Sequence, residues 1–347
     1  MTNHRVALIP GDGIGPEVLD AAWPIIEHAA RSSNVALDAE LLPYSADHYL
    51  ATGETLPDRA FERLRDTADA IMVGALGDPR VPGNEHARDI LLGLRFRLDL
   101  YINFRPIRLW HDRLTRLKDA PTIDFVIFRE NTEGQYTGQG HSDAVGTDAE
   151  THVSEEVNTK KGVERILRAA FQWAEREGKR RITMSDKSNA IPFQRIWGEL
   201  FAAIGEEFPE VEREHRYVDA LAMELVRDPA RFEVIVTNNL YGDILSDLGA
   251  GLVGGLGIAA SANLHPGRPG LFEPVHGSAP LLRGRDMANP MAAALTGALM
   301  LRSLGHDVAA GRLEGAVSLV ISEGPTTPDI GGTAGTVEVA RAIEAAL

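Results

Sequence analysis

Two aspartates four residues apart have the spacing of a pair of carboxylates that could bind a metal ion. Asp243 and Asp247 lie in residues 231–248, where an apolar segment passes through a polar turn into a predicted helix. Residues i and i+4 share one face of a helix, so the two carboxylates lie side by side and repel each other. No Lys or Arg lies within the same two turns. A hard cation such as Mg²⁺ or Mn²⁺ bound between the two carboxylates would compensate their negative charge. The alternative is a solvated acidic helix face.

Five further side chains have types and positions that suit chemistry. Arg95, Arg105 and Arg129 lie at or near the ends of a predicted helix and two predicted strands, where guanidinium groups can bind carboxylates bidentately. Tyr136 and Lys187 each follow a predicted strand, in loop positions that often carry function. Taken singly, each of the five is more commonly a surface ion-pair partner, a packing aromatic or a solvated charge. Together they predict an anion clamp with two proton-transfer groups.

The composition excludes several classes of protein. A formal net charge of −15 at pH 7 argues against a nucleic-acid partner, because phosphate backbones require clustered Lys and Arg. The chain contains no cysteine, which excludes disulfides, thiolate catalysis and Cys-ligated zinc. No apolar run approaches the roughly 18 residues of a membrane span, and the first ten residues do not resemble a signal peptide. We therefore expect a cytoplasmic enzyme with no membrane partner. The net charge does not exclude a small anionic substrate, which needs only a local basic pocket.

Short apolar segments alternate with helical stretches throughout the 347 residues, a length that suits two domains. This alternation predicts an α/β protein with a largely parallel sheet. Strands are expected over 6–9, 70–73, 100–106, 125–128, 182–184 and 232–236, and helices from 17, over 90–97, from a cap at Asn158 to Glu175, over 289–302 and over 337–347. Residues 135–152 are rich in Gly, Ser, Thr and Asp, which predicts a long loop or a β-arm.

Two glycine-containing loops raise the question of a nucleotide. Residues 10–16 follow a strand and open a helix, but their glycines alternate and a proline follows, which does not match the dinucleotide fingerprint. They predict only a tight turn. Residues 271–280, followed by 288–290, combine small and polar side chains that permit close approach of a phosphate or an adenosine. The alternative for this second loop is a buried structural histidine, His276.

Three motifs occur together in the chain: residues 129–134 (RENTEG), 238–247 (NNLYGDILSD) and 272–280 (FEPVHGSAP). In this combination the chain resembles the β-decarboxylating dehydrogenases, the family of the isocitrate, homoisocitrate, 3-isopropylmalate and tartrate/D-malate dehydrogenases, from residue 9 to residue 332. The resemblance implies an isopropylmalate dehydrogenase-like two-domain α/β fold with a mostly parallel sheet core, not a standard Rossmann fold.

The resemblance also implies a division of the chain into domains. Residues 1–102 and 250–347 are expected to form a discontinuous cofactor-binding domain. Residues 103–249 are expected to form the substrate, metal and dimerisation domain, with an arm around 135–152. Members of the family are dimers or larger because each active site is shared, so we expect a homodimer.

The catalytic and metal-binding roles follow from the same resemblance. Asp243 and Asp247 would bind Mg²⁺ or Mn²⁺ together with Asp219 of the second subunit. Lys187, also from that subunit, resembles the base that helps to deprotonate the C2 hydroxyl. Tyr136 resembles the acid that protonates the enol after decarboxylation.

Substrate and cofactor contacts are assigned in the same way. The resemblance implies that Arg95, Arg105 and Arg129 hold the malate carboxylates and that Leu91 and Leu92 face the C3 substituent. NAD is the expected cofactor. Its contacts are expected from Glu273, His276, Gly277, Ser278, Ala279, Asn289, Asp329 and Asn189.

The substituent on C3 is not fixed by the motifs. Leu91 and Leu92 are apolar, which favours oxidation of 3-isopropylmalate to 2-oxo-4-methylpentanoate, a step of leucine biosynthesis. Residues 261–266 and 107–109 also resemble tartrate/D-malate enzymes, and a homoisocitrate or other 3-substituted malate is a further alternative. A non-catalytic family subunit is disfavoured because the Tyr, the Lys and the metal aspartates are all present. A phosphate-transferring enzyme is disfavoured because the chain lacks a Gly-Lys-Ser/Thr loop.

One departure from the family concerns the cofactor. Leu281 stands where the NAD-dependent relatives usually carry an aspartate that binds the adenosine ribose. Arg283 or Arg285 could therefore approach a 2′-phosphate. The segment 327–332 resembles the NAD-using branch, so NAD stays the first expectation and NADP the alternative.

Overall fold

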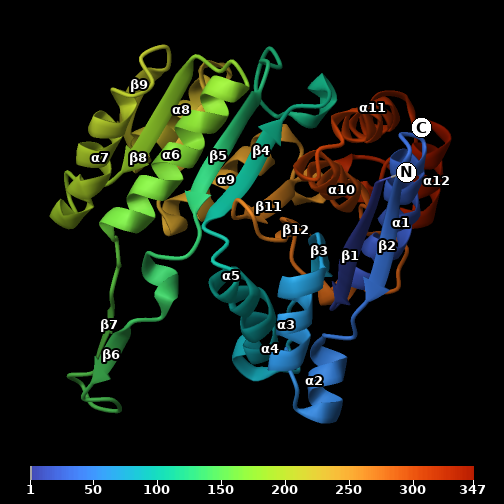
Figure 1. Cartoon of the computed structure of the whole chain (residues 1–347), viewed down its shortest axis with the longest axis horizontal. Coiled ribbons are helices and arrows are strands. Elements are labelled where there is room, and N and C mark those ends of the chain that lie inside the picture. The colour runs from blue at the N-terminus through green and yellow to red at the C-terminus, as the bar shows by residue number, and fades with distance from the viewer. Residues whose placement is uncertain (1) are drawn as a thin grey trace. The chain divides into compact units, whose positions relative to one another are not determined.

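The computed structural model describes residues 2–347. It is an α/β structure, and both of its sheet regions are mostly parallel, so the predicted fold class is confirmed. The chain divides into two compact units, which are described one at a time (Figure 1). Unit one comprises the residues up to Leu100 together with Arg108–Ala120 and Ala250–Leu347, and unit two comprises Tyr101–Ile107 and Pro121–Gly249.

The sheet of unit one has the strand order β2-β1-β3-β12-β11. All neighbouring strands are parallel except β11, which is antiparallel to β12. The apolar run from Val6 to Ile9 in β1 is completely buried, as expected for a parallel strand covered on both faces. The strands are β1 (Thr2–Gly11), β2 (Val35–Leu41), β3 (Ala70–Ala75), β11 (Ala260–Leu264) and β12 (Gly270–Pro274).

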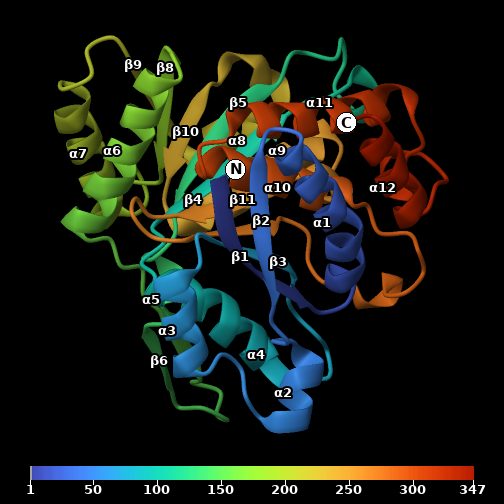
Figure 2. The same ribbon diagram turned by 45° about the vertical axis from the view of Figure 1, so that its right-hand side comes forward.

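The α-helices in the described part of unit one are α1 (Gly15–Arg31), α2 (Ala46–Thr52), α3 (Asp58–Thr67), α4 (Glu85–Ala87), α5 (Gly93–Arg97), α10 (Met291–Ser303), α11 (Asp307–Glu323) and α12 (Thr336–Ala345). Nearly every residue of α10 is buried, as its nearly all-apolar sequence predicts. Gly297 allows α10 to approach α1 closely, because a side chain there would overlap Ile26. Figure 2 shows α1 beside α10 and α12, which matches their packing contacts.

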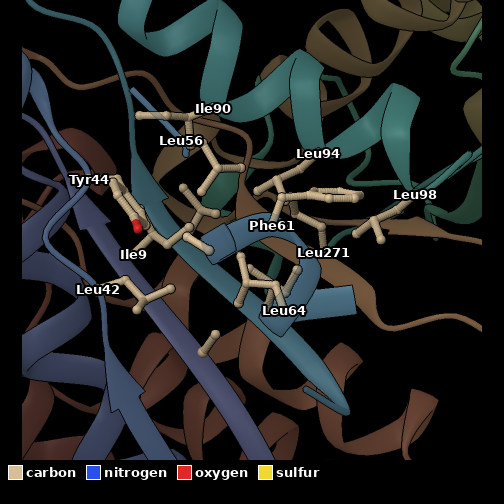
Figure 3. Close-up of a cluster of buried hydrophobic side chains, with 14 of the residues drawn as sticks. Ile9, Leu42, Tyr44, Leu56, Phe61, Leu64, Ile90, Leu94, Leu98 and Leu271 are labelled. Atoms are coloured by element: carbon tan, nitrogen blue, oxygen red, sulfur yellow. The ribbon is translucent and has the colours of Figure 1, made fainter. Parts of the chain in front are cut away.

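An apolar cluster fixes the segment that carries the predicted substrate residues. The helix there contains one π-helical turn, Arg88–Leu92, directly before α5. Figure 3 shows Ile90, Leu94 and Leu98 gathered with Phe61 and other buried side chains of this cluster. Truncation of one such leucine to alanine typically costs about 2–5 kcal/mol. The position of this turn is therefore set by core packing.

The sheet of unit two has the strand order β4-β5-β10-β8-β9, and β5, β10, β8 and β9 are parallel. In register, Thr237 at the end of β10 lies between Arg129 of β5 and Ser185 of β8. The carboxyl ends of these strands therefore meet at one edge of the sheet, a usual place for a site in an α/β fold. The strands are β4 (Ile102–Arg108), β5 (Asp124–Glu130), β8 (Arg181–Asp186), β9 (Glu212–Tyr217) and β10 (Val234–Thr237).

The helices of unit two follow its strands: α6 (Lys160–Arg176), α7 (Arg195–Gly205), α8 (Val218–Arg227) and α9 (Asn239–Val253), the last ending beyond the boundary of the unit. The predicted cap of α6 at Asn158 is wrong by one residue. Thr159 caps the helix, because its Oγ1 accepts from the backbone N–H of Gly162 at 3.0 Å. The Asn158 side chain instead accepts from Trp197 Nε1 at 2.8 Å.

The polar segment predicted as a loop or arm forms an antiparallel hairpin of β6 (Gly140–Asp143) and β7 (Thr151–Ser154). Every residue of both strands is exposed. Figure 1 shows this hairpin projecting away from the sheet of unit two. Within unit two the arm therefore lacks a packing partner for its apolar side chains, such as Val145 and Val153.

The predicted second domain includes residues 108–120, which the structure places in unit one. The physical reason is Arg113, whose guanidinium donates to the carbonyl oxygens of Ile321 at 3.0 Å and Ile330 at 3.2 Å. Tyr101 and Ile102, predicted with the first domain, belong to unit two. The cofactor and substrate roles of the domains stay predictions. Among the described helices, none combines the length and apolar character needed to cross a membrane.

Candidate active site

The acidic pair lies on α9 of unit two, beside two arginines from neighbouring strands. Arg129, at the end of β5, forms a close ion pair with Asp243. Arg105 of β4 lies 3.9 Å from an oxygen of Asp243 and 3.9 Å from an oxygen of Asp247. The helix itself supplies no positively charged side chain, but two neighbouring strands supply Arg105 and Arg129. The absence of Lys and Arg from the same two turns holds, and the two arginines that lie beside the pair are more than 100 positions away in sequence.

Both arginines are buried and held by side chains that the sequence prediction missed. Arg129 donates through Nε and Nη2 to Asn239 Oδ1 at 3.0 and 2.7 Å. Arg105 donates to Asn103 Oδ1 at 2.7 Å and to Ser246 Oγ at 3.3 Å. Asn103 was detectable, since residues two apart on a strand share a face. The guanidinium groups are thus fixed before any ligand binds, which suits an anion clamp.

Tyr136 joins the same cluster from the turn Gln135–Thr137. Its hydroxyl donates to Asp243 Oδ2 at 3.0 Å, and its ring centroid lies 5.5 Å from the Arg129 guanidinium carbon. The side chain is 40% exposed, so the hydroxyl can reach a ligand as well as the carboxylate. The structure therefore brings Arg105, Arg129, Tyr136 and the acidic pair together.

Lys187 and Asp219 form a second charged site in unit two. Lys187 follows β8, and its Nζ lies 2.7 Å from Asp219 Oδ1 in the first turn of α8. The hydrogen bond from Lys187 lowers the pKa of Asp219. The Asp219 side chain is 68% exposed, so this pair lies at the surface of a single chain. Sequence reasoning assigned both residues to one subunit, and the structure places them in contact.

The donor set of α9 fits a hard divalent cation. Burial raises the pKa of Asp247 and the nearby Asp243 raises it further, although Arg105 and Arg129 lower it. Asp247 is thus a partly desolvated carboxylate whose negative charge is not fully compensated, and its oxygens are the ligands that Mg²⁺ or Mn²⁺ prefers.

The described part of a single chain does not supply a complete set of metal ligands. Across residues 2–347, no three His, Cys, Asp or Glu side chains are grouped closely enough to hold a metal ion.

The predicted substrate residues of unit one lie next to the apolar cluster. Leu91 and Leu92 are half-buried in the π-helical turn, and Leu91 packs against the cluster. Arg95 is 8% exposed and donates through Nη2 to Glu273 Oε1 at 2.7 Å. Asn263 Nδ2 donates to the same oxygen at 3.0 Å. A predicted substrate ligand and a predicted cofactor contact are therefore ion-paired to each other.

The predicted cofactor loop contains a histidine that is kept neutral. Burial lowers the pKa of His276, and its Nε2 is buried without a hydrogen-bond partner. The Ser278 carbonyl, two residues on, accepts from the N–H of Ile14 at 2.8 Å. Gly13 has a positive φ of 57°, and a Cβ there would overlap that carbonyl. The loop 10–16, predicted only as a tight turn, thus packs directly on the predicted cofactor loop.

The remaining predicted cofactor residues fall into two places. Asn289 Nδ2 donates to Asp329 Oδ2 at 3.0 Å in unit one. Gly257 adjoins this pair, and a side chain at that position would collide with the Asp329 carboxylate. Ala279 of the loop has a φ of +38°, which is strained for a residue with a Cβ. Asn189 belongs to unit two, where it is exposed two residues after Lys187.

The comparisons with known proteins decide the family. A family model described as isocitrate/isopropylmalate dehydrogenase matches residues 5–345. The chain belongs to this family. It is therefore an oxidoreductase that acts on the CH–OH group of a 2-hydroxy acid and decarboxylates it.

Relatives in this family are similar over nearly their whole length. The "3-isopropylmalate dehydrogenase" of Streptomyces coelicolor is 44% identical over 337 residues, which cover 95% of this chain and 96% of that protein. The protein of the same name from Nocardia farcinica is 42% identical over 346 residues, or 99% and 100% of the two chains. The isocitrate dehydrogenase of Methylococcus capsulatus superposes with a TM-score of 0.88 at 38% identity, covering 99% of both chains.

Proposed function

We propose that the protein oxidises and decarboxylates 3-isopropylmalate to 2-oxo-4-methylpentanoate in leucine biosynthesis, with NAD and Mg²⁺ or Mn²⁺. The observation that carries this proposal is the cluster in which Arg105, Arg129 and Tyr136 surround Asp243. The name of the Streptomyces coelicolor relative supports the substrate. The apolar Leu91 and Leu92 support an apolar substituent on C3.

The arginines hold the carboxylates of the substrate in this proposal. Arg105 and Arg129 are already oriented by Asn103 and Asn239, so little side-chain entropy is lost when an anion binds. Arg95 is proposed as a third carboxylate ligand, on the family resemblance. It would exchange its Glu273 partner for the substrate.

Two side chains of the chain transfer protons. Lys187 Nζ accepts the proton of the C2 hydroxyl as hydride leaves C2, and Tyr136 Oη returns a proton to C3 after carbon dioxide has left. Asp243, Asp247 and the second subunit's Asp219 would hold the divalent cation, which when bound supplies Lewis acidity at the hydroxyl and adjacent carboxylate. NAD, when bound, would supply the acceptor for the hydride. Its proposed contacts are those of the loop 273–279 with Asn289, Asp329 and Asn189.

A shared active site is part of the proposal. Asp219 and Lys187 lie at the surface, and the exposed apolar side chains of Met223 and Val226 lie on the same helix as Asp219. These features support a homodimer in which one subunit contributes Lys187 and Asp219 to the aspartate pair of the other. Location in the cytoplasm is proposed with the function.

NAD is preferred over NADP for a physical reason. Arg283, which could have met a 2′-phosphate, donates to Asp47 Oδ2 at 3.2 Å, and Arg80 donates to the other oxygen of Asp47 at 2.6 Å. The two arginines lower the pKa of Asp47, so the carboxylate stays ionised. A 2′-phosphate would have to displace or face this anion. Leu281 is 83% exposed and offers no polar group to either cofactor.

A substrate panel tests the proposed function. D-malate, tartrate, isocitrate, homoisocitrate and 3-isopropylmalate are each assayed with NAD and NADP in the presence of Mg²⁺ or Mn²⁺. The expected result is a kcat/KM that is highest for 3-isopropylmalate and at least about tenfold higher with NAD than with NADP. The reverse cofactor ratio overturns the NAD assignment, and preference for another acid overturns the substrate. No turnover with any acid would refute the proposal as a whole.

A further inference from the structure

A buried glutamine lies directly beside the backbone of the proposed base. Gln194 ends the turn Pro192–Gln194 that leads into α7, and it is 1% exposed. Its Oε1 accepts from the backbone N–H of Lys187 at 2.6 Å. Its Nε2 donates to both oxygens of Glu156, at 2.9 and 2.8 Å, and lies 3.2 Å from the hydroxyl of Tyr241. Every polar atom of this amide is therefore used.

Glu156 connects this amide to two other elements of unit two. Its Oε1 also accepts from Asn158 Nδ2 at 2.9 Å and from Asn238 Nδ2 at 3.2 Å. Glu156 lies two residues after the arm strand β7, and Asn238 directly precedes α9, which carries the acidic pair. The hydrogen bonds thus join the loop of the base to the start of the metal-binding helix and to the root of the arm.

The main chain of Lys187 is held on both sides. Its carbonyl oxygen accepts from the N–H groups of Ala190 at 2.9 Å and Ile191 at 2.8 Å. Its own N–H is held by Gln194. The peptide is therefore fixed, while the side chain stays 24% exposed and reaches Asp219. A shift of this peptide would move the amino group by a comparable distance, and small displacements of a reacting group reduce rates strongly.

The chemistry of the site requires an amide at position 194. One end faces an N–H and must accept, while the other faces a carboxylate and must donate. A glutamate would place two carboxylates against each other, and an apolar side chain would leave both Glu156 and the Lys187 N–H with an unmade hydrogen bond. Glutamine satisfies both partners at once.

We propose that Gln194, supported by Glu156, is a positioning residue that fixes the backbone of Lys187 and thereby the place from which its amino group reaches the reacting hydroxyl. The proposal rests on the proposed function, in which Lys187 is the base. Neither Gln194 nor Glu156 takes part in proton transfer itself. Their effect is on the rate of the oxidation step and not on the affinity for the substrate.

The first test compares Gln194→Met with Gln172→Met, which makes the same change at an exposed glutamine of α6. With 3-isopropylmalate, Gln194→Met is expected to lower kcat about tenfold while KM stays within about threefold, because the side chain acts through the base. Gln172→Met keeps the wild-type kcat. A kcat of Gln194→Met within twofold of the wild type overturns the proposal.

An exchange of the two side chains separates positioning from general packing. Gln194→Glu alone places two carboxylates face to face, and kcat is expected to fall at least about tenfold. Adding Glu156→Gln restores a donor between the two side chains and leaves an acceptor for the Lys187 N–H. The double variant is expected to recover kcat at least about fivefold relative to Gln194→Glu. A double variant no more active than Gln194→Glu overturns the proposal, whether or not Gln194→Met folds.

Backbone hydrogen exchange distinguishes failure of this inference from failure of the proposed function. The Lys187 amide should exchange at least about fivefold faster in Gln194→Met than in the wild type, since its acceptor is gone. This measurement needs no turnover. Unchanged exchange at Lys187 overturns the positioning role. A faster exchange in a protein that oxidises none of the acids supports the contact and contradicts only the proposed function.

Discussion

The two units differ in how they stabilise the polar groups of their candidate sites. In unit two, buried arginines are paired with carboxylates, and the site is built from full charges. In unit one, the Arg95–Glu273 ion pair lies at the start of the predicted cofactor loop, but residues 276–279 carry no Asp, Glu, Lys or Arg. That part of the loop contains a neutral His276 and relies on a backbone hydrogen bond to Ile14 and on the close approach of Gly13. The difference suits the proposed ligands. A small anion and a divalent cation are stabilised by side chains of opposite charge. A nucleotide is bound largely by backbone groups, and it can approach the backbone closely only where no large side chain stands in the way.

Removal of a metal-binding carboxylate should give the largest effect. Asp247→Ala is expected to lower metal-dependent turnover by at least about 10³-fold, because a bound Lewis acid supplies several kcal/mol of transition-state stabilisation. Binding of NAD, measured by calorimetry, should stay detectable, since the proposed cofactor loop belongs to the other unit. Glu210→Ala, which removes an exposed carboxylate of the same unit, serves as the control. Unchanged activity of Asp247→Ala would exclude its role as a ligand.

Removal of a buried arginine should give the next largest effect. Arg129→Met removes a proposed carboxylate ligand of the substrate and leaves Asp243 without its close partner. Loss of such a contact costs about 2–5 kcal/mol of binding free energy when the charges are buried. Because Asp243 is 39% exposed, we expect kcat/KM to fall about 10²-fold, at the lower end of that range. Arg176→Met breaks a pair whose arginine is 65% exposed and should change nothing measurable. Equal effects of the two variants would contradict the view that unit two is built on buried charge.

Mixed dimers test whether the two charged sites of unit two meet across subunits. Asp247→Ala and Lys187→Ala are each expected to be inactive as homodimers. In the proposed dimer, Asp247 and Lys187 of one active site come from different subunits. A random mixture of the two variants should then regain about a quarter of wild-type activity, because half of the dimers are mixed and one of the two sites in each mixed dimer is intact. Reassembly is followed by kcat at a fixed total concentration. No recovery in a mixture shown to exchange subunits would exclude a shared site.

The pH dependence of stability should give the smallest effect and should come from unit one. Burial lowers the pKa of His276, so the folded state favours the neutral ring and the unfolded state binds the proton more readily. The contribution of the neutral His276 ring to the free energy of unfolding is therefore fully present above the ordinary histidine pKa of about 6.5 and is lost as the pH falls below that value. His276→Gln should therefore lose less unfolding free energy between pH 7 and pH 5 than the wild type, as measured by urea denaturation. His152→Gln, on the exposed arm, should follow the wild type. A curve for His276→Gln parallel to that of the wild type would contradict the neutral histidine.

Much of the fold was predictable because its signals are local. The buried run from Val6 to Ile9 and most of helix α10 are visible in the sequence as apolar stretches, and both are found in the core. The cap of α6 was placed one residue early, because Asn158 and Thr159 are both good capping residues. Only the tertiary contact to Trp197 decides between them.

The candidate site was predictable in part. Asp243 and Asp247 are singled out by their spacing, and Arg105 and Arg129 by their places near the ends of predicted strands. The side chains that orient those arginines were missed, as were Gln194 and Glu156. Asn, Gln and Ser occur at many surface positions, so their types alone carry no signal.

The sequence by itself determined that the chain is an α/β protein, that two carboxylates share a helix face, and that a set of arginines, a tyrosine and a lysine accompany them. Spacing along a helix or strand is a local property, so these statements need no knowledge of the fold. Only the tertiary structure decided that the arginines beside Asp243 come from β4 and β5 and that Gln194 holds the backbone of Lys187. Such contacts depend on which strands become neighbours in the sheet, and that order is set by packing over the whole chain.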